Sequence, residues 1–273
     1  MPVAPVTTIL MPDRLPTREP GATHGRARVF AAAGWGLVAG SALLVGALVG
    51  YLARVPRGVI ATVMGFGSGV LMSAVAFDLI AEAHNLGGLL PTAGGAAAGA
   101  AVYTAANAYL ASRGARHRKR SGKQPSESEQ AGSGTAIAIG ALLDGIPESV
   151  VIGASMIGGG GVSAVTVAAV FISNVPEGLS SAAGMRQAHR SKTYVFGLWT
   201  AIALISGLSA LLGNALLTQA DPTWLAGITA FAGGAILSMI ADTMIPEAFE
   251  DAHLLVGLST VAGFLTAFAL SHT

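Results

Sequence analysis

Cysteine is absent from this chain of 273 residues, and charged residues make up only 11% of it. Without cysteine the protein has neither disulfides nor thiolate metal sites. A soluble domain carries about a quarter charged residues, whereas 52% of this chain is hydrophobic. The sequence also has no glycine-rich loop of the kind that cradles phosphates, so nothing indicates ATP binding. The composition therefore predicts an all-α protein that crosses a membrane several times.

Apolar stretches of about 20 residues with few or no charges follow one another along most of the chain. Before them, residues 1–28 are polar and rich in proline and arginine, and we predict a disordered tail there rather than a cleaved signal peptide. Residues 29–273 then form one domain with eight membrane-spanning helices. The predicted spans are 29–53, 58–83, 89–112, 134–157, 162–185, 193–218, 223–249 and 254–272.

Lysine and arginine are missing from all eight spans and gather in the loops between them. Eleven of the fifteen lie at residues 54–57, 113–131 and 186–192. The positive-inside rule predicts that these loops are cytoplasmic and that both termini lie outside the cytoplasm. The composition of residues 113–131 cannot form a core, so we predict a flexible cytoplasmic loop there, which contacts anionic lipid rather than nucleic acid.

Acidic residues, by contrast, do occur inside the predicted spans. A carboxylate in the middle of a span costs about 2.5 to 3.5 kcal/mol on insertion scales. Because no span contains lysine or arginine, we expect no internal salt bridge, so these acids are either protonated or visited by a cation. The seven acidic residues are Asp78, Glu82, Asp144, Glu148, Glu177, Asp242 and Glu247.

The fourth and fifth spans carry the same short phrase, in which a proline precedes a glutamate. Residues 144–148 read Asp-Gly-Ile-Pro-Glu and residues 173–177 read Ser-Asn-Val-Pro-Glu. Each proline frees a backbone carbonyl one turn earlier, and the two acids of the first phrase share a helix face. Carboxylates beside free carbonyls suit a divalent cation. The predicted metal ligands are Asp144, Glu148, Asn174, Glu177 and Ser173.

The second and seventh spans are related by an internal repeat. Residues 66–73 resemble residues 231–238, and the same offset aligns Glu82 with Glu247. The copies are an odd number of crossings apart, so they run in opposite directions, as in alternating-access carriers. Their acids are either relays for the cation or hydrated groups at the membrane surface. The predicted relays are Asp78 and Glu82 at the entrance, and Asp242 and Glu247 at the exit.

The two proline-glutamate phrases, in adjacent spans of an eight-span chain with a basic loop before the first, resemble the Zrt/Irt-like (ZIP) family of divalent metal transporters, as a divergent member of bacterial type. That family typically has His-Asn-x-Pro-Glu-Gly in the fourth span and a polar pair before x-Pro-Glu-Gly in the fifth. The likeness extends from about Gly65 to the C-terminus. It implies a carrier of the plasma (inner) membrane, not an enzyme, which needs no cofactor. Such a carrier binds metal, with zinc as the first candidate, between the fourth and fifth spans and moves it into the cytoplasm by an elevator-like or rocking motion.

Three departures from the family pattern bear on the metal. Asp144 stands where the family has histidine, Gly145 replaces the asparagine, and the sixth span has no acidic residue. One metal site is therefore expected, and the second half-site of the family stays open. An oxygen-only donor set suits manganese, ferrous iron or magnesium, although zinc also accepts carboxylates. Cadmium is a further candidate.

Two other functions remain open at this stage. Inverted repeats with buried acids also serve cation/proton exchangers that export a metal. An intramembrane metallohydrolase would keep its metal and activate water, but such sites use histidine ligands and no histidine lies in the middle of a span. The expected partners are the metal ion and the lipid bilayer, with no nucleic acid. The glycine-rich first and third spans leave homodimerisation open.

Overall fold

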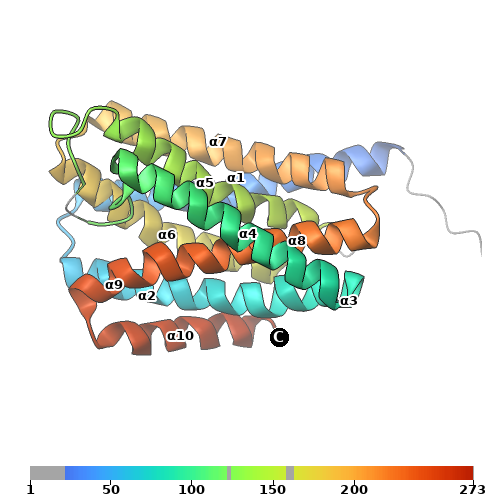
Figure 1. Ribbon diagram of the computed structural model, residues 1–273. Coiled ribbons are helices and arrows are strands. Elements are labelled where there is room, and N and C mark those ends of the chain that lie inside the picture. Colours follow the sequence, from blue (N-terminus) through green and yellow to red (C-terminus); the bar gives the residue numbers. More distant parts are fainter. Residues whose placement is uncertain (1–21, 122–123, 158–162, 273) are drawn as a thin grey trace, which may run out of the picture.

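The computed structural model describes residues 22–121, 124–157 and 163–272 (Figure 1). These residues form ten α-helices and three π-helical turns, without a β-strand. Every apolar segment of the sequence coincides with a helix or a run of consecutive helices, so the prediction of an all-α fold is confirmed. The helices are α1 (Ala22–Leu52), α2 (Arg57–Ala74), α3 (Ala81–Gly87), α4 (Leu89–Leu110), α5 (Ser133–Ala154), α6 (Ala164–Gln187), α7 (Lys192–Leu217), α8 (Pro222–Met239), α9 (Ile245–Ala252) and α10 (Leu255–Leu270). The π-helical turns are η1 (Val75–Ile80), η2 (Ala111–Ala115) and η3 (Ile240–Met244).

Several helical runs are long and apolar enough to cross a membrane, as expected of a multi-pass membrane protein. Within the described residues there are five of them, and α10 is apolar but shorter. α4 falls outside this group and consists largely of alanine and glycine, while α6 carries several polar side chains. The five runs are Gly25–Leu52, Arg57–Gly87, Ser133–Ala154, Lys192–Leu217 and Pro222–Ala252.

Helix α1 begins earlier than the sequence predicts. Residues 1–21 lie outside the described residues, but α1 already begins at Ala22, within the predicted tail of residues 1–28. Residues 22–28 contain no proline, so each backbone N–H can take part in a helix. The polarity of these residues therefore does not end the helix, and the prediction of disorder is wrong for them.

The bundle divides into two groups of helices. In the first, the α6 group, helices α1, α5, α6 and α7 share a core that includes Leu43, Met185 and Trp199. In the second, the α8 group, helices α2, α3, α4, α8, α9 and α10 surround a core built mainly around Met64 and Met239. The two groups meet where α2 packs against α6 and where α5 packs against α8 and α4.

Close packing within the α6 group depends on glycine where α1 crosses α6. A Cβ atom on Gly178 would lie only 2.2 Å from the carbonyl oxygen of Leu43, and one on Gly46 only 2.1 Å from that of Val175. Small residues at such crossings let two helix backbones approach each other. The crossing fixes the part of α6 that carries Glu177.

The runs α2–η1–α3 and α8–η3–α9 share one pattern. Both the first and the last residue of α8 lie 165 positions after those of α2, and a π-helical turn follows each helix at once. In Figure 1, α2 leads to α3 in one direction, whereas α8 leads to α9 in the other. A π-helical turn accommodates an extra residue and is frequent at functional sites.

The three basic loops lie together at one end of the bundle, on the left in Figure 1. The hydroxyl of Tyr51 donates to the carbonyl of Arg190 (2.9 Å), and Arg57 donates to the side chain of Gln187 (3.1 Å). Gln187 in turn donates to the carbonyl of Ser121 (2.6 Å). The start of α1 and the end of α10 lie toward the opposite end.

Candidate functional site

Three of the predicted ligands are buried inside the bundle. Asp144 and Glu148 lie one turn apart on α5, and Glu177 lies on α6; each is less than 5% exposed. Both helices continue through their prolines, Pro147 and Pro176, instead of breaking there. The three carboxylates are therefore held on intact helices of the α6 group.

Two cations from the chain itself form ion pairs within this acidic cluster. Arg118 and Lys119 belong to the predicted flexible loop, yet they are only 2% and 1% exposed. The guanidinium of Arg118 binds Asp144 through two bonds, Nε to Oδ2 (3.0 Å) and Nη2 to Oδ1 (2.9 Å). The ammonium of Lys119 lies 2.9 Å from Glu177 Oε2 and 3.4 Å from Asp144 Oδ2. The expectation that no internal salt bridge forms is wrong, because these cations enter from a loop rather than from a span.

Asp144 has further partners on α4, which belongs to the other helix group. Tyr103 donates its hydroxyl proton to Asp144 Oδ1 (2.6 Å) and accepts a bond from Arg118 Nη2 (2.9 Å). Arg118 Nη1 also donates to Asn107 Oδ1 (2.7 Å). Bidentate, charge-assisted pairs of this kind are the strong hydrogen bonds of proteins. Arg118 thus joins Asp144 of the α6 group firmly to Tyr103 and Asn107 of the α8 group.

The backbone of the basic segment, residues 116–121, is anchored on α6. The hydroxyls of Ser180 and Ser181 donate to the carbonyls of Lys119 and Arg118, the second at 2.6 Å. Gln124 donates to the carbonyls of Arg118 (2.9 Å) and Ser181 (3.1 Å). The segment is therefore ordered against the bundle, contrary to the prediction of a flexible loop.

Charge pairing leaves one of the three acids without a cation of its own. Burial alone would lower the pKa of Lys119, but the carboxylates of Asp144 and Glu177 raise it above its usual range, so the ammonium stays protonated. Glu148 lies within Coulombic range of Glu177, Lys119 and Asp144. Its Oε1 has no hydrogen-bond partner among the described residues. Two cations thus face three carboxyl groups.

Asn174 and Ser173, the other two predicted ligands, make structural hydrogen bonds. The amide nitrogen of Asn174 donates to the carbonyl of Ala39 on α1 (3.0 Å). The hydroxyl of Ser173 donates to Val170 in its own helix (2.9 Å). Both side chains are buried. The Asn174 bond is the structural alternative to ligation, and it leaves the amide oxygen available.

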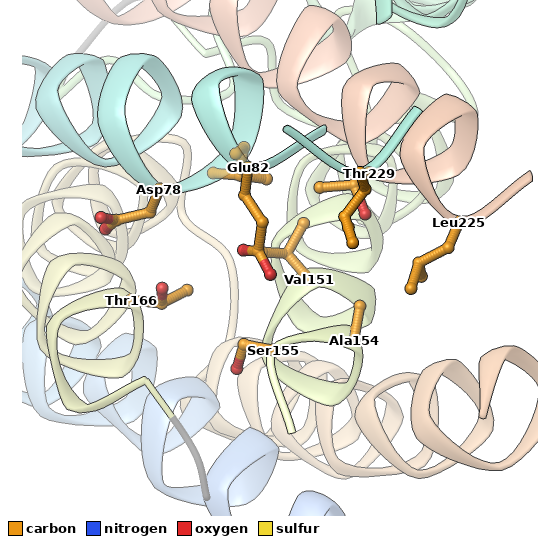
Figure 2. A pocket seen from close by; sticks show the side chains of 10 residues that line it. Asp78, Glu82, Val151, Ala154, Ser155, Thr166, Leu225 and Thr229 are labelled. Atoms are coloured by element: carbon orange, nitrogen blue, oxygen red, sulfur yellow. The ribbon is translucent and has the colours of Figure 1, made fainter. Parts of the chain in front are cut away.

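Asp78 and Glu82, the predicted entrance acids, line a small cavity (Figure 2). It lies near α3, at the end of the bundle away from the basic loops (Figure 1). Figure 2 shows Glu82 reaching toward Val151 of α5, while Thr166 of α6 lies below Asp78. The cavity volume is about 20 Å³, which is room for about one water molecule. Among the described residues, neither acid forms a salt bridge with lysine or arginine. Glu82 is exposed and Asp78 is half-buried.

The two predicted exit acids are in different surroundings. Asp242 is exposed and accepts a bond from Thr104 on α4 (3.3 Å), so it faces outward from the bundle. Glu247 is buried and lines a cavity with Arg120, Ser121 and Ser180, at the end where the basic segment enters. Of the two, only Glu247 lies beside the acidic cluster.

In the observed conformation, the described residues contain no group of three His, Asp or Glu side chains that could hold a metal ion. The Lys119 ammonium lies between the Asp144 and Glu177 oxygens instead. Sequence reasoning missed Tyr103, Arg118 and Lys119. Charge balance could have predicted the two cations. A dense run of lysine and arginine precedes the helix that carries Asp144 and Glu148, and that helix has no cation of its own.

No known family model matches the sequence, and no curated protein matches it closely enough to count as a relative. The acidic cluster and the two proline-glutamate phrases that contain its residues are therefore the features that indicate a function.

Proposed function

We propose that this protein is a ZIP-like membrane carrier that brings a divalent metal cation into the cytoplasm. Eight helical runs would cross the membrane, with α2–η1–α3 and α8–η3–α9 each counted as one crossing and related as inverted repeats. The cargo would be bound by Asp144, Glu148 and Glu177, with the amide oxygen of Asn174 as a further donor. Ser173 would support the site from its own helix.

The observation that carries the proposal is the convergence of buried carboxylates on one cationic nitrogen. Asp144 and Glu177 come from different helices, yet both have an oxygen within 3.4 Å of the Lys119 ammonium. A position between two carboxylates in a low-dielectric interior strongly attracts positive charge. Once Lys119 withdraws, those oxygens and Glu148 would offer an oxygen donor set for a hard or borderline divalent ion.

The distribution of charge supports a direction for transport. The basic loops gather at one end of the bundle, and by the positive-inside rule that end would face the cytoplasm, with both termini outside. The cavity of Asp78 and Glu82 would then be the outer entrance, and Glu247 would lie on the exit path. Asp242 is dropped from that path, because it faces outward toward Thr104.

The two helix groups support a mechanism with a moving part. All three carboxylates belong to the α6 group, whereas the α8 group contains the repeated π-helical turns. A shift of one group against the other would expose the same carboxylates first to one side and then to the other, which is the logic of alternating access.

The donor chemistry bears on the choice of cargo. With Asp144 in place of histidine, all the proposed donors are oxygen atoms, which favours manganese and ferrous iron more than an imidazole site would. Zinc binds carboxylates at similar distances and remains the first candidate by resemblance. Competition between the ions in one assay would rank them.

The test is uptake of zinc, manganese, ferrous iron, cadmium and magnesium into proteoliposomes. We expect uptake of at least one ion by the unaltered protein, and its loss in both Glu148→Ala and Glu177→Ala. Glu129→Ala removes an exposed carboxylate outside the cluster and should leave uptake intact. Folded protein that takes up none of the five ions would overturn the importer.

If import is not observed, the alternative function is export of the metal by cation/proton exchange. Vesicles loaded with metal and given a pH gradient would then release the metal, and release would depend on the same two glutamates. Release without uptake would reverse the direction and keep the site.

A further inference from the structure

The basic segment, residues 116–121, makes specific side-chain contacts with the acidic cluster and backbone contacts with α6. Positive charges that only set the orientation of a protein in the membrane need no such contacts. We infer that this segment is an autoinhibitory latch, which fills the cation position of the site, ties the two helix groups together and is released when cargo binds. This inference rests on the proposed carrier function and adds its regulation.

The first observation is that the segment supplies the charge that a cargo ion would supply. The ammonium of Lys119 contacts Glu177 (2.9 Å) and Asp144 (3.4 Å), and Arg118 binds Asp144 through two bonds. A metal ion and Lys119 cannot both occupy the space between these carboxylates. The segment therefore competes directly with any cation for the same oxygens.

The second observation is that the segment touches both helix groups. Arg118 joins Asp144 on α5 to Tyr103 and Asn107 on α4. Arg120 forms an ion pair with Glu250 on α9. Since α5 belongs to the α6 group while α4 and α9 belong to the α8 group, the segment holds the two groups in one relative position. A shift between the groups would have to break these contacts.

The third observation is that the bundle is shaped to receive the segment. A Cβ atom on Gly184 of α6 would lie 2.2 Å from the carbonyl oxygen of Arg120, and one on Gly140 of α5 would lie 2.5 Å from Cδ of Arg118. Ser180 and Ser181 then bind the carbonyls of the segment. Space and hydrogen bonds thus fit the backbone of the segment as well as its charges.

Such a latch would lower the affinity of the acidic cluster for the metal ion, and the difference can be measured. A protein whose binding-competent state is only partly populated binds its ligand more weakly by that fraction, and a tethered competitor acts at a high effective concentration. Lys119→Met removes the ammonium and keeps an unbranched side chain. We expect the dissociation constant for zinc or manganese to fall at least ten-fold in Lys119→Met, measured by titration of purified protein.

The control is Arg116→Met, which removes an exposed cation of the same segment. It should leave the dissociation constant within two-fold of the unaltered value. Equal affinity in Lys119→Met and in the unaltered protein would overturn the idea that Lys119 competes with the cargo.

A reversible cross-link tests release of the segment, and the absence of cysteine from the chain gives it a clean background. Ser121→Cys with Gln187→Cys puts thiols at the junction where Gln187 donates to the carbonyl of Ser121 (2.6 Å). A short bifunctional methanethiosulfonate reagent would tether the segment to α6 through two disulfides. We expect at least ten-fold loss of uptake when the tether is formed, and recovery after reduction, with no loss in either single variant.

The outcomes separate the latch from the carrier. Equal rates of uptake with and without the tether would overturn the latch and leave the proposed carrier function unaffected. Absence of uptake before tethering and after reduction, from protein that is folded, would overturn the carrier function and the latch with it.

Amine labelling tests docking of the segment without any transport assay. Lys119 should react at least ten-fold more slowly than the exposed Lys192 in the unaltered protein, and Glu177→Gln should speed its labelling. Equal labelling of the two lysines in the unaltered protein would mean that the segment does not dock, which would overturn the latch.

Discussion

Two acidic clusters in this protein are built from the same residue types and lie in opposite surroundings. Asp144 and Glu177 are buried and paired with Arg118 and Lys119. Asp78 and Glu82 line a small cavity, and no lysine or arginine of the described residues lies within salt-bridge distance of them. The first cluster is therefore paired with cations of the chain, whereas the second has no such partner among the described residues.

The two clusters thus differ in whether the chain supplies cations to their carboxylates. A buried acid without a partner costs several kcal/mol, so the chain brings a loop into the bundle to supply cations. An acid with access to water needs no such partner. If the buried cluster is a cargo site, Lys119 must be able to leave it when the metal ion binds. The cluster of Asp78 and Glu82 then needs only to attract the ion.

The largest expected effect comes from breaking the buried pair on one side. Arg118→Ala leaves Asp144 charged and buried, and removing one partner of such a pair costs about 3–5 kcal/mol. We expect that loss in the free energy of unfolding, measured in detergent with a chelator present. Arg116→Ala, at an exposed position, should change it by less than about 0.5 kcal/mol. Similar losses in both variants would mean that the buried pair has no special role.

A smaller loss is expected for Tyr103→Phe, which removes one hydrogen bond to Asp144 and keeps the ring. Hydrogen bonds to charged groups contribute about 1.5–3 kcal/mol. The same unfolding measurement should detect this loss. In an Asp144→Asn background the loss should shrink, because the acceptor is no longer charged; an unchanged loss would assign the effect to packing.

The helix crossing that supports Glu177 should be sensitive to one methyl group. Gly178→Ala would bring a Cβ atom to 2.2 Å from the Leu43 carbonyl oxygen, and overpacking of this kind costs about 1–3 kcal/mol. Gly197→Ala, where a Cβ would meet nothing within 4 Å, should be neutral or slightly stabilising. Comparing the two by thermal unfolding separates close approach from helix propensity, and equal melting temperatures would contradict the crossing.

The smallest effect on stability is expected for substitutions in the cluster of Asp78 and Glu82. Asp78→Asn with Glu82→Gln removes two charges that have no cationic partner in the described part of the chain, so the free energy of unfolding should change by less than about 0.5 kcal/mol. Uptake should instead show a raised KM at low ionic strength, and the difference should fade with salt because screening weakens the attraction. A KM independent of these acids would remove them from the entrance path.

The sequence predicts the helices well because their signal is local. Long apolar segments mark the helical runs, and the repeat of residues 66–73 predicts the matching bounds of α2 and α8. The extension of α1 into residues 22–28 was missed, because polarity alone does not show where a helix begins.

The candidate site was predicted only in part, because its second half depends on contacts distant in sequence. Asp144 and Glu148 share a helix face, as their spacing predicts, and Glu177 is buried with them. The pairing of Lys119 with Glu177 joins residues 58 positions apart. A loop rich in cations normally stays in solvent, and the close approach of this segment to Gly140 and Gly184 is not visible in the sequence pattern.

The most direct test compares one acid from each cluster in the same uptake assay. Glu177→Gln and Glu82→Gln each replace a carboxylate by an amide of the same shape, and both proteins would be checked for folding before zinc and manganese uptake is measured. The buried cluster as cargo site predicts that Glu177→Gln abolishes uptake, while Glu82→Gln keeps its maximal rate with a higher KM. Full uptake by Glu177→Gln would contradict the cargo site.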